Sequence, residues 1–461
     1  MIIDTIPIKS DVVIIPDAGS NQFEEQRTLS NQGRPTIILD HHNVQLDYPR
    51  YENVIIVNNQ VSPRFKNNAS SGAGVVYKTI QAFNEKYSDE FPMIYEEFAD
   101  LAAVGIVSDM MDTRNPDNNY IIQKGLNDIK NPMLKALLKK QDRGDSGGVS
   151  SQTNPTKIDI AFYVAPLING MVRFGEMSEK ELLFKGFINY EDVNTEINTT
   201  YNQKERTELY HDYIARICYN VRNRQNRKKE KAMKFLKDRV EENNLNEHKL
   251  IIVTVSKDDP IEVPKTITGL VAMELLKIYK KPVLVLRPKS DGDGGTVYAG
   301  SGRGKIHGDF QSLFQMLRDS GLCEFVEGHD MAHGVSIKEE NIEQVLEFAD
   351  NYLKDVEFDV DLVEVDYIFD KPSEINIDML KIFAENNQLY GNGIPQPKFA
   401  FELKASKDNV RIIGKNQNTI KIQYGGIDFI AFNEKEKANA IKESDAYLFE
   451  FTIIGRSEIN T

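Results

Sequence analysis

Two adjacent histidines follow an acid at the end of an apolar, β-branched segment. Of all the groups of residues in the sequence, this one is the strongest candidate for a catalytic or metal-binding site. Residues 37–39 read Ile-Ile-Leu and lead directly into Asp40, His41 and His42. Open α/β sheets place their functional side chains at the carboxyl ends of strands. An acid and two imidazoles at such an edge can bind a divalent metal ion or contact a phosphate group.

Two further apolar segments end in an acid. Residues 11–16 lead into Asp17 and residues 102–108 lead into Asp109, and we expect both segments to be strands. Each acid taken alone is most often a helix N-cap or a turn residue. Three acids at three predicted strand ends, one of them followed by paired histidines, instead favour a metal site. Carboxylates mixed with neutral imidazoles suit Mn²⁺ better than Ca²⁺.

At these positions the sequence resembles the DHH phosphoesterase superfamily. The matching segments read Asp-Ala-Gly-Ser (17–20), Leu-Asp-His-His (39–42), Ser-Ser-Gly-Ala-Gly (70–74) and Gly-Ile-Val-Ser-Asp (105–109). The resemblance implies a site for two Mn²⁺ (or Mg²⁺) ions, in which Asp17 bridges both ions while His41 and Asp109 hold one of them. It also implies two catalytic residues: His42 faces the substrate phosphate and Asp40 supports the imidazoles.

Composition limits the class of protein. A chain of 461 residues exceeds one hydrophobic core, and roughly three domains are expected. Two cysteines cannot form a disulfide framework, which favours a reducing compartment. The sequence has no signal-peptide pattern and no apolar run of about 18 residues, so we expect a cytoplasmic protein without a membrane partner. The net charge of −14 argues against nonspecific coating of duplex DNA, but a nuclease with a local basic groove remains compatible.

The expected fold class is α/β, with four units along the chain. Residues 1–200 predict a parallel-sheet DHH lobe that is incomplete at its N-terminus, and residues 201–245 predict a long bridging helix. Residues 246–357 predict a smaller α/β lobe, and residues 358–461, with many short strands, predict an OB-like β-barrel. The basic run at residues 222–231 of the bridging helix is more often a solvated helix face than a nucleic-acid surface.

The resemblance continues beyond the first lobe. Residues 164–174 resemble a RecJ segment from which Asn169 and Arg173 carry over, whereas residues 300–304 and 327–334 resemble the two motifs of the DHH-associated domain. This likeness implies that nucleic-acid phosphates near the cleaved end are contacted by Asn169, Arg173, Ser301, Arg303 and His329. By turn chemistry alone, the Gly-Ser-Gly-Arg-Gly at 300–304 would be a turn with an exposed arginine.

Residues 389–399 resemble the signature that opens the OB-fold domain of RecJ single-strand exonucleases. OB surfaces bind single strands by stacking bases on aromatic rings above a basic groove. The aromatic candidates are Phe399, Phe401, Tyr424 and Phe429. Each of these rings is more often part of a small barrel's core than of its binding surface.

The order of these units makes a RecJ-like 5′–3′ single-stranded DNA exonuclease the leading hypothesis, acting by a two-metal mechanism in DNA recombination and repair. The expected partner is single-stranded DNA, with a single-strand-binding protein or a helicase as further partners. A small-nucleotide or oligonucleotide phosphodiesterase of the same superfamily would share the metal site without needing the barrel. A third reading is a catalytically incomplete single-strand-binding or scaffold relative.

The family's first metal motif, of the type His-x-Asp-x-Asp-Gly, has no match in residues 1–16. The last strands also stop earlier than RecJ barrels usually do. We therefore expect a fragment, a misannotated start or one part of a split gene. One ion would keep Asp17, His41 and Asp109, and the other would keep only Asp17, so weak Mn²⁺ binding and slow degradation of single strands are expected. Asp112 is the first candidate for a replacement ligand.

Overall fold

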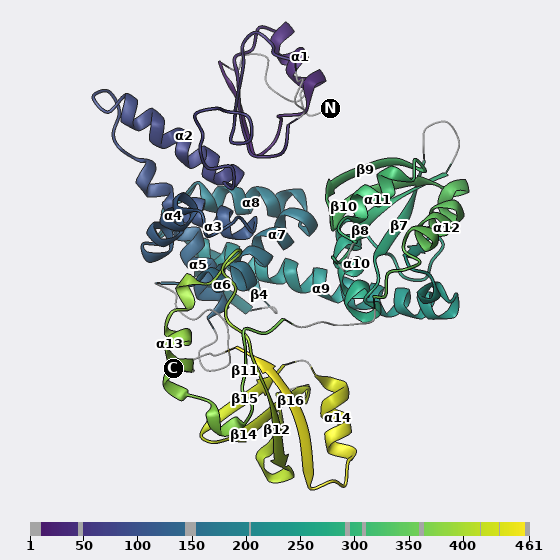
Figure 1. Ribbon diagram of the computed structural model, residues 1–461. Helices are drawn as coiled ribbons and strands as arrows, with labels where there is room; N and C mark the ends of the chain where they lie inside the picture. The colour runs from purple at the N-terminus through teal and green to yellow at the C-terminus, as the bar shows by residue number, and fades with distance from the viewer. Residues whose placement is uncertain are drawn as a thin grey trace.

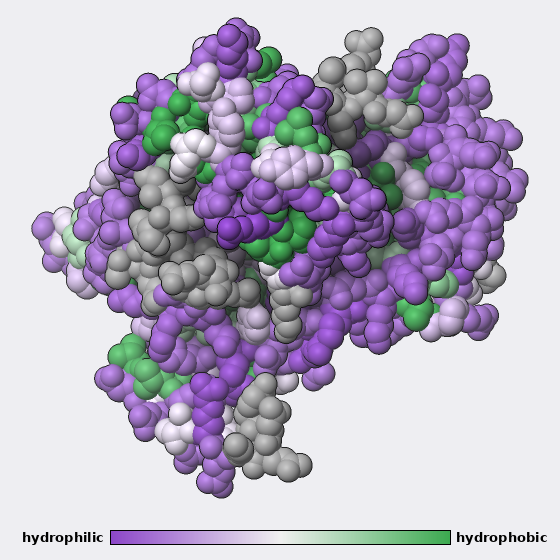
Figure 2. Space-filling model, turned by 90° about the horizontal axis from the view of Figure 1, so that it is seen from below, coloured by the Kyte–Doolittle hydropathy of each residue, from purple (hydrophilic) through white to green (hydrophobic). Residues whose placement is uncertain are grey.

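The computed structural model shows a mixed α/β molecule with a parallel sheet, as the sequence predicts (Figure 1). No helix within the described ranges is long and apolar enough to cross a membrane. The face seen in Figure 2 is mostly hydrophilic, and its apolar residues form separate small patches. The structure describes residues 11–44, 49–142, 154–201, 204–290, 296–306, 310–358, 364–414, 416–432 and 434–456.

A three-stranded parallel sheet places the first candidate residues at one edge. Its strands β1 (Val13–Pro16), β2 (Thr36–Asp40) and β3 (Val54–Asn58) lie in that order, and α1 (Phe23–Asn31) connects the first two. Short β-branched runs favour such strands because branched side chains pack well on a pleated surface. Pro16 of β1 lies beside Leu39 of β2, so the residues that follow the two strands are neighbours.

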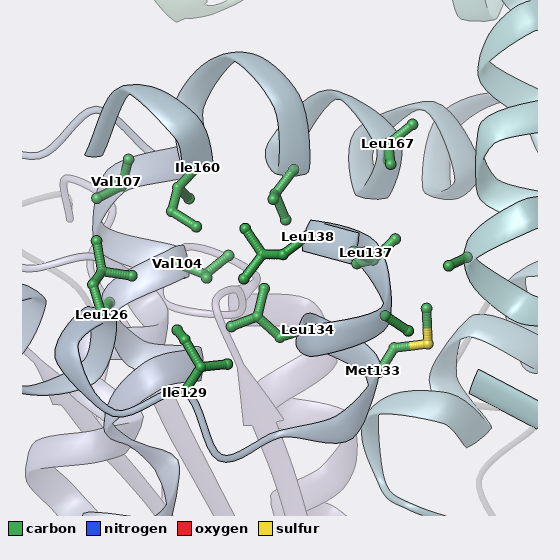
Figure 3. Packing of buried hydrophobic residues seen from close by; sticks show 14 of the residues in the cluster. Val104, Val107, Leu126, Ile129, Met133, Leu134, Leu137, Leu138, Ile160 and Leu167 are labelled. Carbon is green, nitrogen blue, oxygen red and sulfur yellow. The ribbon is translucent and has the colours of Figure 1, made fainter. Parts of the chain in front are cut away.

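The segment before Asp109 is a helix, and the prediction of a strand there was wrong. Residues 102–108 belong to α3 (Ala99–Ser108), which is buried on most sides. A short apolar run does not distinguish a buried strand from a buried helix. Small residues allow this helix to pack closely, since a Cβ at Gly105 would overlap with that of Ala73. Figure 3 shows Val104 and Val107 of α3 in the core of the lobe.

Helices surround α3 and supply the rest of the core of the first lobe. Leu134, Leu138 and Leu167 are fully buried there, as Figure 3 shows. The helices of this lobe, apart from α1 and α3, are α2 (Gly72–Lys86), η2 (Tyr95–Phe98), α4 (Pro116–Asn127), α5 (Pro132–Gln141), α6 (Lys157–Asp159), η4 (Ile160–Val164), α7 (Ala165–Phe174) and α8 (Met177–Phe187). The lobe therefore combines a small sheet with a largely helical core.

A single long helix connects the first lobe to the second. The hairpin of β4 (Glu196–Tyr201) and β5 (Lys204–Leu209) leads into α9 (Tyr210–Glu242), which is 33 residues long. Apolar residues at helical spacing place the first half of α9 in the core of the first lobe and the second half, including Leu236 and Val240, in that of the second. A bridging helix predicted from this spacing is therefore present (Figure 1).

The basic run of α9 is not simply solvated. Arg224 pairs with Glu179 of the first lobe at 2.7 Å, whereas Lys229 pairs with Glu274 of the second at 3.3 Å. Exposed ion pairs contribute little stability individually. Their position nevertheless shows that several of these cations face neighbouring elements of both lobes.

The second lobe is a five-stranded sheet of order β6-β7-β8-β10-β9, covered by helices. Residues 300–303 lie inside β8, so the turn interpretation of this segment was wrong. A Cβ at Gly300 would overlap with the carbonyl oxygen of Val285. Glycine is required here because β7 and β8 approach each other closely. The elements are η5 (Leu245–Glu247), β6 (Ile251–Thr254), η6 (Lys265–Ile267), α10 (Thr268–Tyr279), β7 (Val283–Ser290), β8 (Thr296–Arg303), α11 (Leu313–Asp319), β9 (Cys323–His329), β10 (Ala332–Lys338), η7 (Glu339–Asn341) and α12 (Ile342–Tyr352).

Both cysteines are free and contribute to hydrophobic cores. Cys218 is buried in α9, and Cys323 is half-buried at the start of β9. Burial raises the pKa of Cys218 to about 12 and that of Cys323 to about 11. Neither thiol is therefore suited to nucleophilic chemistry near neutral pH.

The C-terminal unit contains two three-stranded sheets that share one core, and its described residues do not form a closed barrel. Phe399 and Phe401 are buried in that core and Phe429 packs against it, whereas Tyr424 is exposed. Tyr424 is thus the candidate whose ring is accessible to a base. The elements are β11 (Tyr367–Ile368), η8 (Pro372–Glu374), α13 (Ile377–Glu385), η9 (Asn387–Leu389), β12 (Phe399–Ser406), η10 (Lys407–Asn409), β13 (Val410–Ile413), β14 (Thr419–Tyr424), β15 (Ile427–Ala431), α14 (Lys435–Glu443) and β16 (Leu448–Gly455).

Candidate metal centre

Three elements bring acidic side chains and an imidazole together around His41. Asp17 follows β1, His41 follows β2 and Asp109 follows α3. Nε2 of His41 lies 3.2 Å from Oδ1 of Asp17 and 3.2 Å from Oδ2 of Asp109. The parallel pairing of β1 and β2 continues into this site, because the Asp17 N–H donates to the Leu39 carbonyl oxygen at 2.8 Å.

His41 lies between negative charges. Its hydrogen bond with Asp17 raises its pKa; burial opposes this effect, and the charges of Asp109, Asp17 and Asp40 add to it. An imidazole that attracts a proton in this way also attracts a metal cation once it is neutral. Two carboxylates and one imidazole are a donor set that fits a divalent transition ion.

Asp40 orients both histidines from a buried position. Oδ1 of Asp40 accepts hydrogen bonds from Nδ1 of His42 at 2.7 Å and from the His41 N–H at 2.8 Å, and Oδ2 accepts one from the Ser20 N–H at 3.0 Å. Burial alone would raise the pKa of Asp40, but the hydrogen bonds from His42, Ser20 and His41 outweigh it and lower the pKa. The carboxylate therefore stays charged and holds Nδ1 of His42, while Nε2 can face a ligand. Ligand atoms of Asp17, His41 and His42 lie within 4.8 Å of one another.

The small residues at 70–74 bring the start of α2 against Asp17. Ser71 caps the helix by accepting a hydrogen bond from the Gly74 N–H at 3.2 Å. A Cβ at Gly72 would overlap with Oδ1 of Asp17. The positive end of the helix dipole thus lies beside a negative ligand, an arrangement that stabilises the carboxylate.

Buried asparagines that sequence reasoning missed connect the loops around this centre. Asn58, the last residue of β3, donates to Oγ of Ser20 and to the His42 carbonyl oxygen, both at 2.9 Å. Asn118 donates to the carbonyl oxygens of Ala69 at 2.7 Å and Asp112 at 2.9 Å. The position of Asn58 at a strand end was a usable signal, whereas nothing in the sequence identifies Asn118.

The carboxylate of Asp112 is engaged by Arg114. Its carboxylate accepts hydrogen bonds from Nε of Arg114 at 3.0 Å and from Nη2 at 2.7 Å. These bonds lower the pKa of Asp112. A carboxylate held by a guanidinium fork is poorly placed to replace a metal ligand, which argues against the role expected for Asp112.

Of the five residues expected to contact phosphate, Ser301 and Arg303 lie on the same side of β8, beside Gly269. Arg303 on β8 is half-buried, and burial together with the charge of Arg173 at the end of α7 lowers its pKa. Two neighbouring cations favour an anion between them. Oγ of Ser301 lies 2.9 Å from Oγ1 of Thr268, and Asn169 lies one helical turn before Arg173. His329 ends β9, and its side chain lies outside the described residues.

Comparison with known proteins matches both ends of the chain to families. Residues 2–106 match the N-terminal domain of the DHH family, and residues 370–461 match the RecJ OB domain. The putative SPbeta prophage-derived single-strand DNA-specific exonuclease YorK of Bacillus subtilis is 34% identical over 462 residues, which cover 99% of this chain and 77% of YorK. The chain therefore belongs to the RecJ-like branch of the DHH family.

Solved structures share the fold at lower identity. RecJ from Thermus thermophilus in complex with Mn²⁺ superposes with a TM-score of 0.71 at 20% identity, covering 98% of this chain. The match spans 59% of that RecJ chain. A second exonuclease RecJ bound to manganese gives a TM-score of 0.54 at 21% identity and covers 78% of this chain.

Proposed function

We propose that this chain hydrolyses phosphodiester bonds of single-stranded DNA from the 5′ end, as a metal-dependent exonuclease. The observation that supports this most is the position of His41 Nε2, which lies 3.2 Å from a carboxylate oxygen of Asp17 and 3.2 Å from one of Asp109. The name of YorK, a relative over nearly the whole chain, supports the choice of substrate. A role in recombination and repair, and single-strand-binding protein or helicase partners, remain part of the same proposal.

Asp17, His41 and Asp109 would hold a Mn²⁺ or Mg²⁺ ion, because oxygen and imidazole donors already converge there. When bound, such an ion generates a hydroxide nucleophile and stabilises charge on the phosphoryl group. A second ion, as the family resemblance implies, would share Asp17. The donor set proposed for the first ion is Asp17, His41 and Asp109.

The chain's own side chains would position the strand and stabilise its charge. His42, held at Nδ1 by Asp40, would donate from Nε2 to a phosphate oxygen. Arg303, together with Arg173, would bind backbone phosphates through planar guanidinium groups. The C-terminal unit would guide the single strand, with the exposed ring of Tyr424 as a stacking surface.

The test compares digestion of long 5′-phosphorylated single strands with that of di- and trinucleotides, with Mn²⁺ or with EDTA. We expect Mn²⁺-dependent shortening of the long strand from its 5′ end, lost in Asp109→Ala. The matched control is Asp128→Ala, which removes an exposed acid at the end of α4. Activity limited to di- and trinucleotides would favour the small-nucleotide phosphodiesterase instead, whereas strand binding without any hydrolysis would favour the scaffold relative.

A further inference from the structure

A tight turn from the C-terminal unit lies against the loop that carries Asp109. Gly391 and Ile394 close this turn through two backbone hydrogen bonds of 2.9 and 3.1 Å. Gly393 has a φ of 86°, which glycine adopts without strain. Figure 1 shows this part of the chain, in yellow-green, beside α6 of the first lobe. Residues nearly three hundred positions apart in sequence therefore meet at this point.

Asn392, within the turn, contacts both ends of the segment that follows Asp109. Its carbonyl oxygen accepts hydrogen bonds from the Thr113 N–H at 2.9 Å and from Thr113 Oγ1 at 2.8 Å. Its Nδ2 donates to the carbonyl oxygen of Met110. Met110 is the residue directly after Asp109 and has a φ of 53°, a region that non-glycine residues rarely adopt.

The surfaces on either side of this contact fit closely. A Cβ at Gly393 would overlap with Oδ1 of Asp112, and one at Gly391 would lie 3.0 Å from Cδ of Lys157. Lys157 is buried, and its Nζ donates to the Leu389 carbonyl oxygen at 3.1 Å. The burial of this lysine indicates a closely packed interface, and the Leu389 carbonyl oxygen supplies the hydrogen-bond acceptor that a buried polar group requires.

The loop needs this support because Asp109 lies where α3 ends. Two backbone hydrogen bonds connect the loop to α3. The Met110 N–H donates to the Val107 carbonyl oxygen at 3.2 Å, and the Met111 N–H donates to the Ile106 carbonyl oxygen at 3.1 Å. The bonds of Asn392 hold the same loop from the opposite side. A left-handed residue next to a ligand persists only when its surroundings determine its conformation.

We propose that Asn392 is a positioning residue for the metal ligand Asp109, so that the C-terminal unit completes the metal centre as well as binding the strand. This inference rests on the proposed metal site. It gives the turn at residues 391–394 a function distinct from that of an OB surface. Mutation of a group that orients a metal ligand typically lowers metal affinity or activity by about 10- to 100-fold.

The experiment measures Mn²⁺ binding to the full chain by titration calorimetry, alongside thermal unfolding without metal. We expect Asn392→Ala and Asn392→Asp to weaken Mn²⁺ binding by roughly tenfold. Thr113→Val removes one of the two hydrogen bonds to the Asn392 carbonyl oxygen and should weaken binding less. The matched control is Asn386→Ala, whose side chain bonds to Ile382 within its own exposed helix at 2.7 Å, and which should leave affinity unchanged.

Equal Mn²⁺ affinity in wild type and folded Asn392→Ala would overturn the inference while leaving the proposed function intact. If Asn392→Ala does not fold, Thr113→Val decides, and unchanged affinity in that variant overturns the inference. A lower melting temperature with unchanged affinity would also overturn it, because the turn would then be only a structural contact. A wild-type chain with no measurable Mn²⁺ binding would overturn both proposals.

Discussion

Asp17 has little freedom at the centre of the site. Its φ is 58°, and its carboxylate packs against Gly72 at the start of α2. A left-handed, non-glycine residue costs free energy that the surrounding structure must supply. The side chain is therefore held in place for His41 by the end of β1 on one side and by α2 on the other.

Gly72→Ala tests this constraint at a single residue. The added methyl overlaps with Oδ1 of Asp17, so the carboxylate must move away from His41, and we expect Mn²⁺ affinity to fall roughly tenfold. Calorimetric titration measures the change, and far-ultraviolet circular dichroism checks that the chain still folds. Gly455→Ala is the control, since nothing lies within 4 Å of a Cβ there. Wild-type affinity in Gly72→Ala would contradict the expected displacement.

Sequence reasoning identified the chemistry-bearing residues better than the residues that hold them. Asp17, His41 and Asp109 are recognisable because acids and imidazoles after apolar segments are unusual enough to note. The structure brings these three together. Asn118 and Asn392 were not identified, because an asparagine acquires its role from whichever carbonyl lies nearby in three dimensions. The roles assigned to the phosphate-contacting residues stay predictions.

At the scale of elements, periodicity decided what could be predicted. The bridging helix predicted within residues 201–245 has apolar residues at clear helical spacing, and it is present as α9. The segment before Asp109 is almost entirely apolar, so it shows no helical spacing of apolar and polar residues. The sequence alone therefore favours a strand there. Packing against its neighbours, chiefly α2 and α4, determines that this segment is helical. The domain limits drawn from the sequence remain a prediction.

A half-buried ion pair connects the end of α9 to the loop after β6, and its effect on stability can be measured. Arg239 donates from Nη1 and Nη2 to Asp259 at 2.8 and 2.7 Å and stacks on Phe235. We expect Asp259→Ala to destabilise the second lobe by about 2 kcal/mol near neutral pH, a typical value for hydrogen bonds to charged groups. Thermal unfolding measures this, with the neighbouring Asp258→Ala as the control.

The Arg239–Asp259 pair also predicts how stability changes with pH. Hydrogen bonding from Arg239 holds the pKa of Asp259 below its ordinary value of 3.8. The contribution is therefore complete above that value and is lost as the pH falls through the lower, folded-state pKa. The gap in melting temperature between wild type and Asp259→Ala should shrink as the pH is lowered below 3.8. A gap that stays constant over this range would show that the carboxylate's charge is not what stabilises α9.

At the scale of the whole molecule, a metal ion at Asp17, His41 and Asp109 would join the sheet, α3 and, through Asn392, the C-terminal unit. A ligand that binds only the folded state stabilises it by about 2.7 kcal/mol at a hundred times its dissociation constant. Because a chain of several domains need not unfold in one step, the stabilisation should appear first in the transition of the first lobe.

Calorimetric scans with and without Mn²⁺ test this expectation. We expect the first-lobe transition to move upward with Mn²⁺ in wild type and in Asp128→Ala, and to stay in place in Asp109→Ala. An equal upward shift in Asp109→Ala would mean that Mn²⁺ stabilises the chain from another site. A shift in the C-terminal transition as well would agree with the contact through Asn392.

The high thiol pKa values of Cys218 and Cys323 have a practical consequence for labelling this protein. With pKa values near 12 and 11, both thiols remain protonated and react slowly with maleimides. A cysteine introduced on an exposed position of each lobe can then carry a fluorophore without first removing Cys218 or Cys323. Energy transfer between such dyes would report whether the distance between the lobes at the two ends of α9 changes when a single-stranded oligonucleotide is added.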